Sequence, residues 1–323
     1  MSGKNGAIRS GEKKTVEWRR SADTLSRITL EKGVDGLVEE YLNAEKHAPS
    51  CTITAFRKNN ALGKNRSPYV GCLDETRVVL NNMPNDYIHA NYVGFSQKPH
   101  RFIITQAPLD TTIVDFWAMI AQEKSEHIVM ICDFIEDGKS KCSEYFPRER
   151  GRKKIFENFE ITCMASEQIK STNSTSVVIS RLKLSSVNGS FNLTHYFLNN
   201  WPDRKVPDDP KILIKIMSMI RVSRNPIVVH CSTGIGRSGT FVGIELMLET
   251  VSCNLPLPHP NLLDFLRRQR AHAISTDLQY VFIFDFILDY FRTEHIISQY
   301  VITGIQKFHE EFENLKASNK GLK

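Results

Sequence analysis

Apolar residues recur at helical spacing in several parts of the chain. In the segment 24–48 they are Leu37, Val38, Tyr41 and Leu42. Further along, apolar residues at positions i, i+3, i+4 and i+7 form a stripe from Ile113 to Ile120. That stripe predicts a helix with one face in the core. The same period predicts four further helices, over 211–220, 241–251, 261–269 and 277–291.

Short apolar runs and one alternating stretch predict strands. The runs Ile128–Ile131 and Ile227–Val229 are fully apolar, which is typical of buried strands. Residues 174–197 alternate instead, and Asn188-Gly189 within them is a strong signal for a hairpin turn, so we expect an antiparallel meander there. No internal repeat and no linker rich in Pro, Gly or Ser divides the chain. The pattern therefore predicts one α/β domain.

The two ends of the chain differ from the rest. Residues 1–20 are polar and basic, and we expect a disordered arm there. Residues 295–315 are amphipathic, which favours a helix docked on the domain over one that binds a partner. The predicted organisation is an arm with a lead-in helix over 1–34, a main domain over 35–292, and a C-terminal helix with a polar tail over 293–323.

Composition and charge narrow the classes of function. The 323 residues include 42 basic and 36 acidic side chains, a net charge of +6, and the basic residues are dispersed. A solvated surface explains such dispersion better than a nucleic-acid patch, and a mild positive field suits an anionic substrate. The cysteines are odd in number and include no CxxC pair, which argues against a disulfide framework or a zinc site and favours a reducing compartment. They are Cys51, Cys72, Cys132, Cys142, Cys163, Cys231 and Cys253.

The sequence also bears on location. The chain begins Met-Ser and continues with polar residues, so we expect neither a signal peptide nor a myristoylation site. No apolar run reaches the length of a membrane span. We therefore expect a cytoplasmic protein, with the nucleus as the alternative. The sequence gives no indication of the oligomeric state.

The segment Val228–Phe241, VVHCSTGIGRSGTF, carries the most specific chemistry in the chain. An apolar strand ends at His230, a lone cysteine follows, and a glycine-rich turn opens a helix. The N–H groups of such a turn converge on one point, and the helix dipole adds positive charge there, so the turn is an anion cradle. Arg237 can clamp two oxygens of the anion, and a thiol in these surroundings becomes a nucleophilic thiolate. A thiolate beneath a tetrahedral dianion predicts attack at phosphorus; the competing interpretation is a structural turn with an inert buried cysteine.

The string HCSTGIGRSGTF resembles the signature of the cysteine-dependent, non-receptor-type protein tyrosine phosphatases, which usually carry alanine where Thr233 stands. Six other segments resemble that family in order and spacing. They are KNRSPYVGCLDETRVVL (64–80), NDYIHANYV (85–93), TQAPLDTTIVDFW (105–117), KCSEYFP (141–147), NWPDRKVP (200–207) and STDLQYVFI (275–283).

This resemblance covers 35–292, and its implications concern fold and activity. It implies a single catalytic domain with a twisted mixed β-sheet flanked by helices. It also implies hydrolysis of phosphotyrosine in proteins through a cysteinyl-phosphate intermediate, with a role in signalling. The partners would be phosphotyrosine-containing proteins, and the reaction would need neither a cofactor nor a metal. Oxidation would reversibly inactivate the nucleophile.

The resemblance assigns the central chemical roles. Cys231 would be the nucleophile, and Arg237 would bind the equatorial oxygens. Asp203, which alone would be interpreted as a solvated loop acid, would protonate the leaving tyrosyl oxygen and later accept a proton from water. Ser238 would assist the departure of the cysteine. The substrate-binding residues would be Ser232, Thr233, Gly234, Ile235, Gly236, Arg237 and Gln279.

Supporting roles follow for four more residues. His230 would help to hold the thiolate and Glu136 would orient the arginine; the simpler interpretations are a satisfied core histidine and a solvated turn acid. Lys141 would contact the acid loop that begins at Trp201. Gln279 would help to place water.

Several positions depart from the family pattern, and they leave three hypotheses for the function. The family has a cleft-wall tyrosine at Ser67, a substrate-gripping aspartate at Tyr69 and a water-positioning glutamine at Ser275. Because the nucleophile, arginine and acid are present, an active tyrosine phosphatase is favoured. The alternatives are a weakly active, phosphotyrosine-binding relative and a phosphatase with a broadened substrate range. Glycines of the family are replaced at Lys205, His272 and Ala107.

Overall fold

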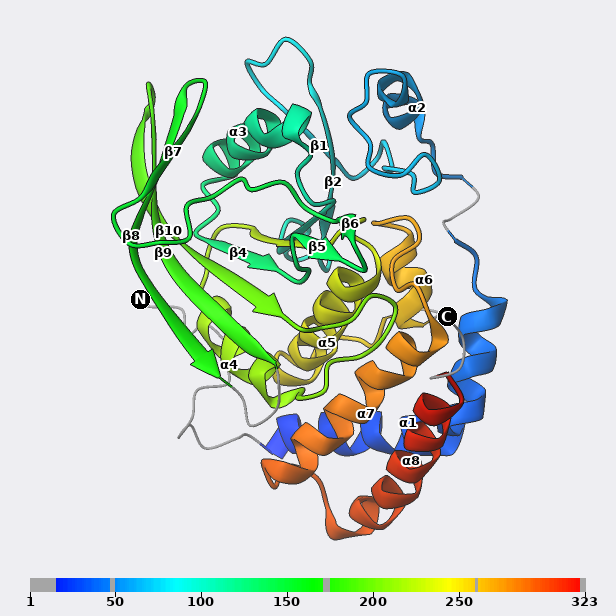
Figure 1. The fold of residues 1–323 in the computed structure, drawn as a ribbon. Helices are drawn as coiled ribbons and strands as arrows, with labels where there is room; N and C mark the ends of the chain where they lie inside the picture. The colour runs from blue at the N-terminus through cyan, green and yellow to red at the C-terminus, as the bar shows by residue number, and fades with distance from the viewer. Residues whose placement is uncertain (1–15, 47–49, 171–174, 259–260, 320–323) are drawn as a thin grey trace.

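A nine-stranded mixed β-sheet forms the centre of the computed structural model, which describes residues 16–46, 50–170, 175–258 and 261–319. The strand order is β1-β2-β3-β11-β4-β10-β9-β8-β7, and a separate hairpin pairs β5 with β6. Figure 1 shows the sheet with helices packed around it. The strands are β1 Arg77–Val79, β2 Tyr87–Val93, β3 Phe102–Thr105, β4 His127–Met130, β5 Ile135–Glu136, β6 Lys139–Ser140, β7 Lys153–Phe156, β8 Phe159–Lys170, β9 Ser176–Ser186, β10 Gly189–Asn199 and β11 Ile227–His230.

Four strands at the centre of the sheet run parallel. β11 pairs in parallel with β3 on one side and β4 on the other, and β4 pairs in parallel with β10. Every residue of β11 is buried, which explains its continuous apolar run: both faces of the strand are covered. The carboxyl ends of the four strands therefore meet along one edge of the sheet, where open α/β folds place their ligands.

The helices cover the sheet and form a second layer beyond it. α5 contacts β11 and β3, and α7 lies between α5 and the pair α1 and α8 (Figure 1). A 3-10 turn, Asp110–Thr112, precedes α3. The helices are α1 Val16–Asn43, α2 Thr54–Asn60, α3 Ile113–Glu123, α4 Lys211–Ile220, α5 Gly236–Ser252, α6 Leu262–Arg267, α7 Asp277–Thr293 and α8 Gln299–Ser318.

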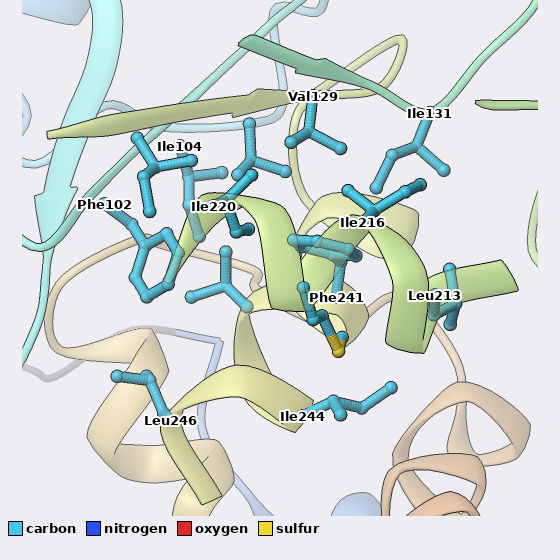
Figure 2. Close-up of a cluster of buried hydrophobic side chains, with 14 of the residues drawn as sticks. Phe102, Ile104, Val129, Ile131, Leu213, Ile216, Ile220, Phe241, Ile244 and Leu246 are labelled. Carbon is cyan, nitrogen blue, oxygen red and sulfur yellow. The ribbon is translucent and has the colours of Figure 1, made fainter. Parts of the chain in front are cut away.

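The main core lies between the sheet and helices α4 and α5. Figure 2 shows Phe102 and Ile104 of β3 facing Ile216 and Ile220 of α4, with Phe241 of α5 beside them. All five side chains are fully buried or nearly so. Burial of apolar side chains contributes about 1.5–3 kcal/mol each, so this cluster anchors α5, the helix that follows the glycine-rich turn, against the sheet.

The structure confirms the predicted fold class, an α/β domain with a twisted mixed sheet. The 211–220 helix coincides with α4, and the predicted meander corresponds to β9 and β10, joined at Asn188. The prediction of disorder over 1–20 is wrong for residues 16–20. They begin α1, because Trp18 packs its ring edge-on against Phe291 of α7. The rest of the predicted arm lies outside the described residues.

The C-terminal helix α8 lies against α1 and α7. It buries Val301, Ile305, Phe308 and Phe312, which recur at helical spacing along one face. The face toward α7 also holds a polar contact, in which the Nδ1 atom of His309 is 3.0 Å from the carboxyl group of Asp285. Thus the contact between α7 and α8 is mainly apolar, with one titratable acid inside it.

Asp285 makes the stability of this contact depend on pH. Burial raises the pKa of Asp285 to about 6, although His309 opposes that shift. The fold therefore favours the neutral acid, and its contribution to stability is lost as the pH rises from about 4 to 6. We expect Asp285→Asn to raise the free energy of unfolding by about 1–3 kcal/mol at pH 7.5 and by much less at pH 4.5. Urea unfolding at both pH values measures this.

The matched control is Asp289→Asn, since Asp289 lies on the same helix but is only partly buried and is paired with Arg292. Its charge is only a minor cause of the raised pKa of Asp285, so Asp289→Asn should change stability by much less than Asp285→Asn at both pH values. An equal gain for Asp285→Asn at pH 4.5 and 7.5 would show that the buried carboxyl does not titrate in this range.

Candidate active site

The glycine-rich turn lies at the carboxyl edge of the parallel strands. β11 ends at His230, Cys231 follows as the first residue of the turn, and α5 begins at Gly236. Cys231 is 3% exposed, at the base of the turn. The residue before the helix, Ile235, provides no side-chain cap, so the first N–H groups of α5 are not occupied by one.

Five consecutive carbonyl groups, from Cys231 to Ile235, are hydrogen-bonded to the surrounding protein. In a trans peptide unit the C=O and the following N–H point in opposite directions, so these bonds turn the N–H groups of residues 232–236 to the inside of the turn. Within the part of the chain that the structure describes, the N–H groups of 232–235 have no acceptor. The carbonyl of Cys231 accepts from His230 Nδ1 at 3.2 Å, and that of Ser232 accepts from Ala107 N at 2.8 Å. Arg270 donates from Nη2 to Thr233 at 3.2 Å and from Nε to Gly234 at 3.0 Å. The carbonyl of Ile235 accepts from Gly239 N and Ile274 N, both at 3.0 Å.

Gly234 allows the turn to come this close to the sheet. Its φ is +67°, a left-handed conformation that side chains disfavour. A Cβ atom at this position would also lie 2.0 Å from the carbonyl oxygen of Thr105, at the end of β3. Only glycine satisfies both conditions at this position.

Arg270 is a structural element of the site that sequence reasoning missed. Its side chain is fully buried, and its guanidinium binds two successive carbonyls of the turn as well as Oδ1 of Asn91 at 2.8 Å. In the sequence it belongs to a basic stretch, RRQRAH, that has the composition of a solvated surface. No local signal distinguishes it, because its partners come from distant segments.

Arg237 occupies the first turn of α5 and is held by Glu136. Two parallel hydrogen bonds, of 2.6 and 3.0 Å, join its Nη atoms to the two carboxylate oxygens, and Nη1 also donates to the carbonyl of Trp201 at 2.8 Å. Burial alone would lower the pKa of Arg237, but Glu136 and Cys231 raise it above its usual value, so the guanidinium stays charged. Its Nε atom and the hydroxyl of Ser238 are buried without a partner among the described residues.

The small hairpin β5–β6 supplies two of the predicted residues. Its turn is Asp137-Gly138, with positive φ at both positions, a sequence typical of two-residue hairpins that could have been recognised in advance. Glu136 ends β5, and Lys141 follows β6. The Nζ atom of Lys141 is 2.9 Å from Asp203 Oδ2, and Nη2 of Arg237 is 3.8 Å from Asp203 Oδ1. The fold thus brings together the predicted acid, arginine and lysine.

The segment that carries Asp203 is fastened to the start of α7. Trp201 Nε1 donates to the carbonyl of Lys205 at 2.8 Å, and Gln279 Nε2 donates to the same oxygen at 3.2 Å. Thr276 donates its hydroxyl to the carbonyl of Arg204 at 3.3 Å. The acid is therefore presented on a backbone held by its own tryptophan and by α7.

The pKa of Asp203 is lower than usual in this arrangement. Partial burial alone would raise it, but the hydrogen bond from Lys141 and the charge of Arg237 outweigh that effect. The ligand-free protein therefore keeps Asp203 ionised. A phosphate dianion next to Arg237 would raise the pKa again through like-charge repulsion.

The departures from the family pattern also have definite positions. Tyr69 is 85% exposed, so it does not replace the cleft-wall tyrosine missing at Ser67, which is half-buried. Ser275 faces Gly236, where an added Cβ atom would lie 2.7 Å from the serine hydroxyl. Gln279 is fully buried, and its amide oxygen accepts from Ser275 N at 3.2 Å. Its amide nitrogen donates to the carbonyl of Lys205, so the Gln279 amide joins the backbone at Ser275 to the backbone of the segment that carries Asp203.

Two other substitutions lie at the edge of the site. His272 adopts a φ of +62°, and its N–H donates to the carbonyl of Lys46 at 2.7 Å, so this position keeps the left-handed backbone that suits a glycine. Ala107 is fully buried, and its N–H is one of the donors that hold the turn. Neither replacement interrupts the cradle.

The chain belongs to the protein-tyrosine phosphatase family. The family model described as "Protein-tyrosine phosphatase" matches residues 61–289, which include the glycine-rich turn, the acid segment and the Glu136 hairpin. The predicted family is thereby confirmed, while the domain boundaries at 35 and 292 stay predictions.

Curated proteins and solved structures with similar sequences agree with this assignment. The chain is 35% identical over 234 residues to the Tyrosine-protein phosphatase Lar-like of Caenorhabditis elegans, which covers 70% of the chain and 10% of that protein. It is 32% identical over 285 residues to human Tyrosine-protein phosphatase non-receptor type 9, covering 81% of the chain and 47% of that protein. The chain thus spans less than half the length of these relatives. The crystal structure of the catalytic domain of human protein tyrosine phosphatase non-receptor type 18 superposes with a TM-score of 0.73 at 27% identity, over 84% of this chain and 99% of that one.

Two further observations concern membranes and metals. None of the helices in the described residues combines the length and apolar character that crossing a membrane requires. Within the same residues, His, Cys, Asp and Glu side chains do not gather in groups of three or more that could hold a metal ion.

Proposed function

We propose that this chain hydrolyses phosphotyrosine in proteins, with Cys231 as the nucleophile. One observation carries the proposal: the buried turn that begins at Cys231 and the helix start after it hold inward N–H groups, the Nε atom of Arg237 and the hydroxyl of Ser238, none with a partner among the described residues. Buried donors without partners are rare in proteins, and a tetrahedral oxyanion satisfies this set. Ser232, Thr233, Gly234, Ile235 and Gly236 supply the backbone of that cradle.

In the first step the sulfur of Cys231 attacks phosphorus. An S–P bond forms while the bond between phosphorus and the tyrosyl oxygen breaks, and the electron pair leaves with that oxygen. Asp203 gives its proton to the oxygen, which releases tyrosine and leaves a carboxylate. Arg237, oriented by Glu136, binds the equatorial oxygens throughout.

In the second step water attacks the cysteinyl-phosphate. A new O–P bond forms, the S–P bond breaks, and its electron pair returns to the sulfur as the thiolate. Asp203 accepts the proton of the water, and Ser238 donates a hydrogen bond that assists the departure of the sulfur. Gln279 acts here by holding the acid segment, since its amide bonds Ser275 and Lys205.

The substrate range depends on the wall of the cleft. A family tyrosine at Ser67 would limit entry to long aromatic phosphates, and the exposed Tyr69 does not restore that wall. This observation favours a second candidate function, a phosphatase with a broadened substrate range. Phosphotyrosine remains the first candidate because the chain belongs to the protein-tyrosine phosphatase family. Phosphotyrosine-containing proteins are then the partners, in a signalling role.

The proposed location is the cytoplasm, with the nucleus as the alternative. The supporting observation is that the seven cysteines, all of which lie in the described residues, form no disulfide, which suits a reducing compartment.

Replacing Asp203 tests the proposed function. We expect Asp203→Asn to lower kcat on a phosphotyrosine peptide about 10²- to 10⁴-fold, because the tyrosyl oxygen then leaves without a proton. On aryl phosphates with more acidic leaving groups the loss should shrink. In the wild type kcat should fall at high pH as the acid form of Asp203 is lost, and the variant should lack that fall. Steady-state assays over pH and leaving group measure this.

The control is Asp208→Asn, which removes an acid from the same segment and should leave the profile unchanged. A phosphoserine peptide serves as the second substrate: comparable rates on both peptides would favour the broadened range over phosphotyrosine specificity. If the wild type turned over neither peptide nor any aryl phosphate, the proposed function would be wrong.

A further inference from the structure

A buried tyrosine hydroxyl joins two histidines behind the nucleophile. The hydroxyl of Tyr145 lies 2.8 Å from Nε2 of His230 and 2.6 Å from Nε2 of His195 on β10. All three residues are fully buried. His230 continues the chain of contacts to the carbonyl of Cys231, while the ring of His195 stacks on Phe146 with centroids 3.9 Å apart. Neither His195 nor Tyr145 has a role predicted from the sequence.

The chemistry of the acceptors fixes the direction of the hydrogen bonds that link His195, Tyr145, His230 and Cys231. A carbonyl oxygen only accepts, so Nδ1 of His230 carries the proton that binds Cys231 O. Burial lowers the pKa of His230 to about 4, so the ring is neutral and its Nε2 is an acceptor. The hydroxyl of Tyr145 therefore donates to His230.

The contact of Tyr145 with His195 then runs the other way. The sulfur of Met130, 3.9 Å from the hydroxyl, is a longer and weaker acceptor than Nε2 of His230. The single hydrogen of the Tyr145 hydroxyl is used toward His230, so its oxygen accepts, and the donor is the Nε2–H group of His195. Burial holds the pKa of His195 far below its usual value, so this ring is neutral too, with the bare nitrogen at Nδ1. That Nδ1 atom is buried without a partner among the described residues, so Nε2–H is the one donor of this neutral ring.

We propose that His195 is a positioning residue for the reaction at Cys231. Its Nε2–H directs the Tyr145 hydroxyl toward His230 and so holds His230 in the tautomer with the proton on Nδ1. That proton keeps the carbonyl of Cys231 outward and the N–H of Ser232 inside the cradle. Without the donor, the hydroxyl can turn and His230 can take the other tautomer, which places a nitrogen lone pair against the carbonyl.

Few other titratable groups lie near the hydrogen bonds that link His195, Tyr145 and His230. The thiols of Cys132 and Cys142 lie close enough to affect the pKa of Tyr145, and Arg66 and Arg237 contribute to the low pKa of His230. The two arginines keep their charge over the accessible pH range. Changes at His195 can therefore be followed at neutral pH without titrating its neighbours.

The inference rests on the proposed function, but its test measures the reactivity of the Cys231 thiol and the tautomers of the histidines, and both can be measured without turnover. His195→Gln keeps a donor at a similar distance from the backbone, whereas His195→Met has the same length and no donor. Alkylation of Cys231 by iodoacetate, followed by mass spectrometry over pH 5–9, reports the thiolate fraction. We expect about a 10-fold loss of reactivity at pH 6 and of kcat/KM in His195→Met, and near wild-type values in His195→Gln.

Nitrogen-15 NMR of histidines in the unaltered protein reads the tautomers directly and needs no variant. We expect the proton on Nδ1 of His230 and on Nε2 of His195. The reverse assignment overturns the proposal, as does an unchanged alkylation profile in His195→Met or an equal loss in both variants, which would indicate packing alone. A wild type whose Cys231 alkylates readily while no phosphoester is hydrolysed would instead contradict the proposed function.

Discussion

Replacing Cys231 with serine is expected to abolish turnover while the protein still binds its substrate. The hydroxyl of serine stays protonated at neutral pH, so the cradle holds the phosphoryl group with no nucleophile beneath it. We expect kcat to fall at least about 10⁴-fold on a phosphotyrosine peptide. The outward bonds of the turn and the Arg237–Glu136 pair are unaffected, so the dissociation constant should change little. Stopped assays and calorimetric titration of the peptide measure the two quantities.

The matched control is Cys253→Ser, since this cysteine is exposed and remote from the turn in sequence. It should keep wild-type turnover. Loss of peptide binding in Cys231→Ser, with the fold intact, would mean that the sulfur itself organises the cradle.

Adding one methyl group at Gly234 is expected to destroy the cradle. The new Cβ atom would lie 2.0 Å from the carbonyl oxygen of Thr105, and the backbone φ of +67° would add strain. Because Thr105 ends β3 in the middle of the sheet, it cannot move aside. We expect Gly234→Ala to reduce the free energy of unfolding by about 3 kcal/mol or more and to eliminate binding of vanadate.

Gly63 provides a closely matched control, because its φ is +65° and a Cβ atom there would meet nothing within 4 Å. Gly63→Ala should therefore reduce stability by about 1 kcal/mol, the strain of the left-handed backbone alone, and leave vanadate binding intact. Urea unfolding and calorimetry compare the two variants. Equal stability losses would show that the turn yields to the methyl group.

The sequence allowed the site to be predicted where its chemistry lies in short contiguous segments. The turn from His230 to Ser238 contains its nucleophile, its glycines and its arginine within nine neighbouring positions, and each has a local chemical meaning. The α/β class was equally accessible, because buried parallel strands such as β11 are uniformly apolar.

What the sequence could not supply are contacts between distant segments. Arg270 binds carbonyls 36 and 37 positions away and has the local context of a surface residue. Tyr145 and His195 meet behind the site although they are 50 positions apart, and His195 itself comes near β11 because β10 pairs with β4 and β4 with β11. The same holds for Gln279, whose engagement with Lys205 depends on how the acid segment folds back onto α7. These contacts follow from strand order and from the way loops fold onto the helices, which periodicity does not determine.

The central claim is that the cradle directs a phosphoryl group onto the sulfur of Cys231. Its most direct test is to mix the protein with a phosphotyrosine peptide, quench with denaturant within a single turnover, and locate the phosphate by mass spectrometry of the digested chain. We predict phosphate on Cys231 in the wild type and none there in Cys231→Ser. Turnover in the wild type with the phosphate on another residue, or on none, would contradict the account.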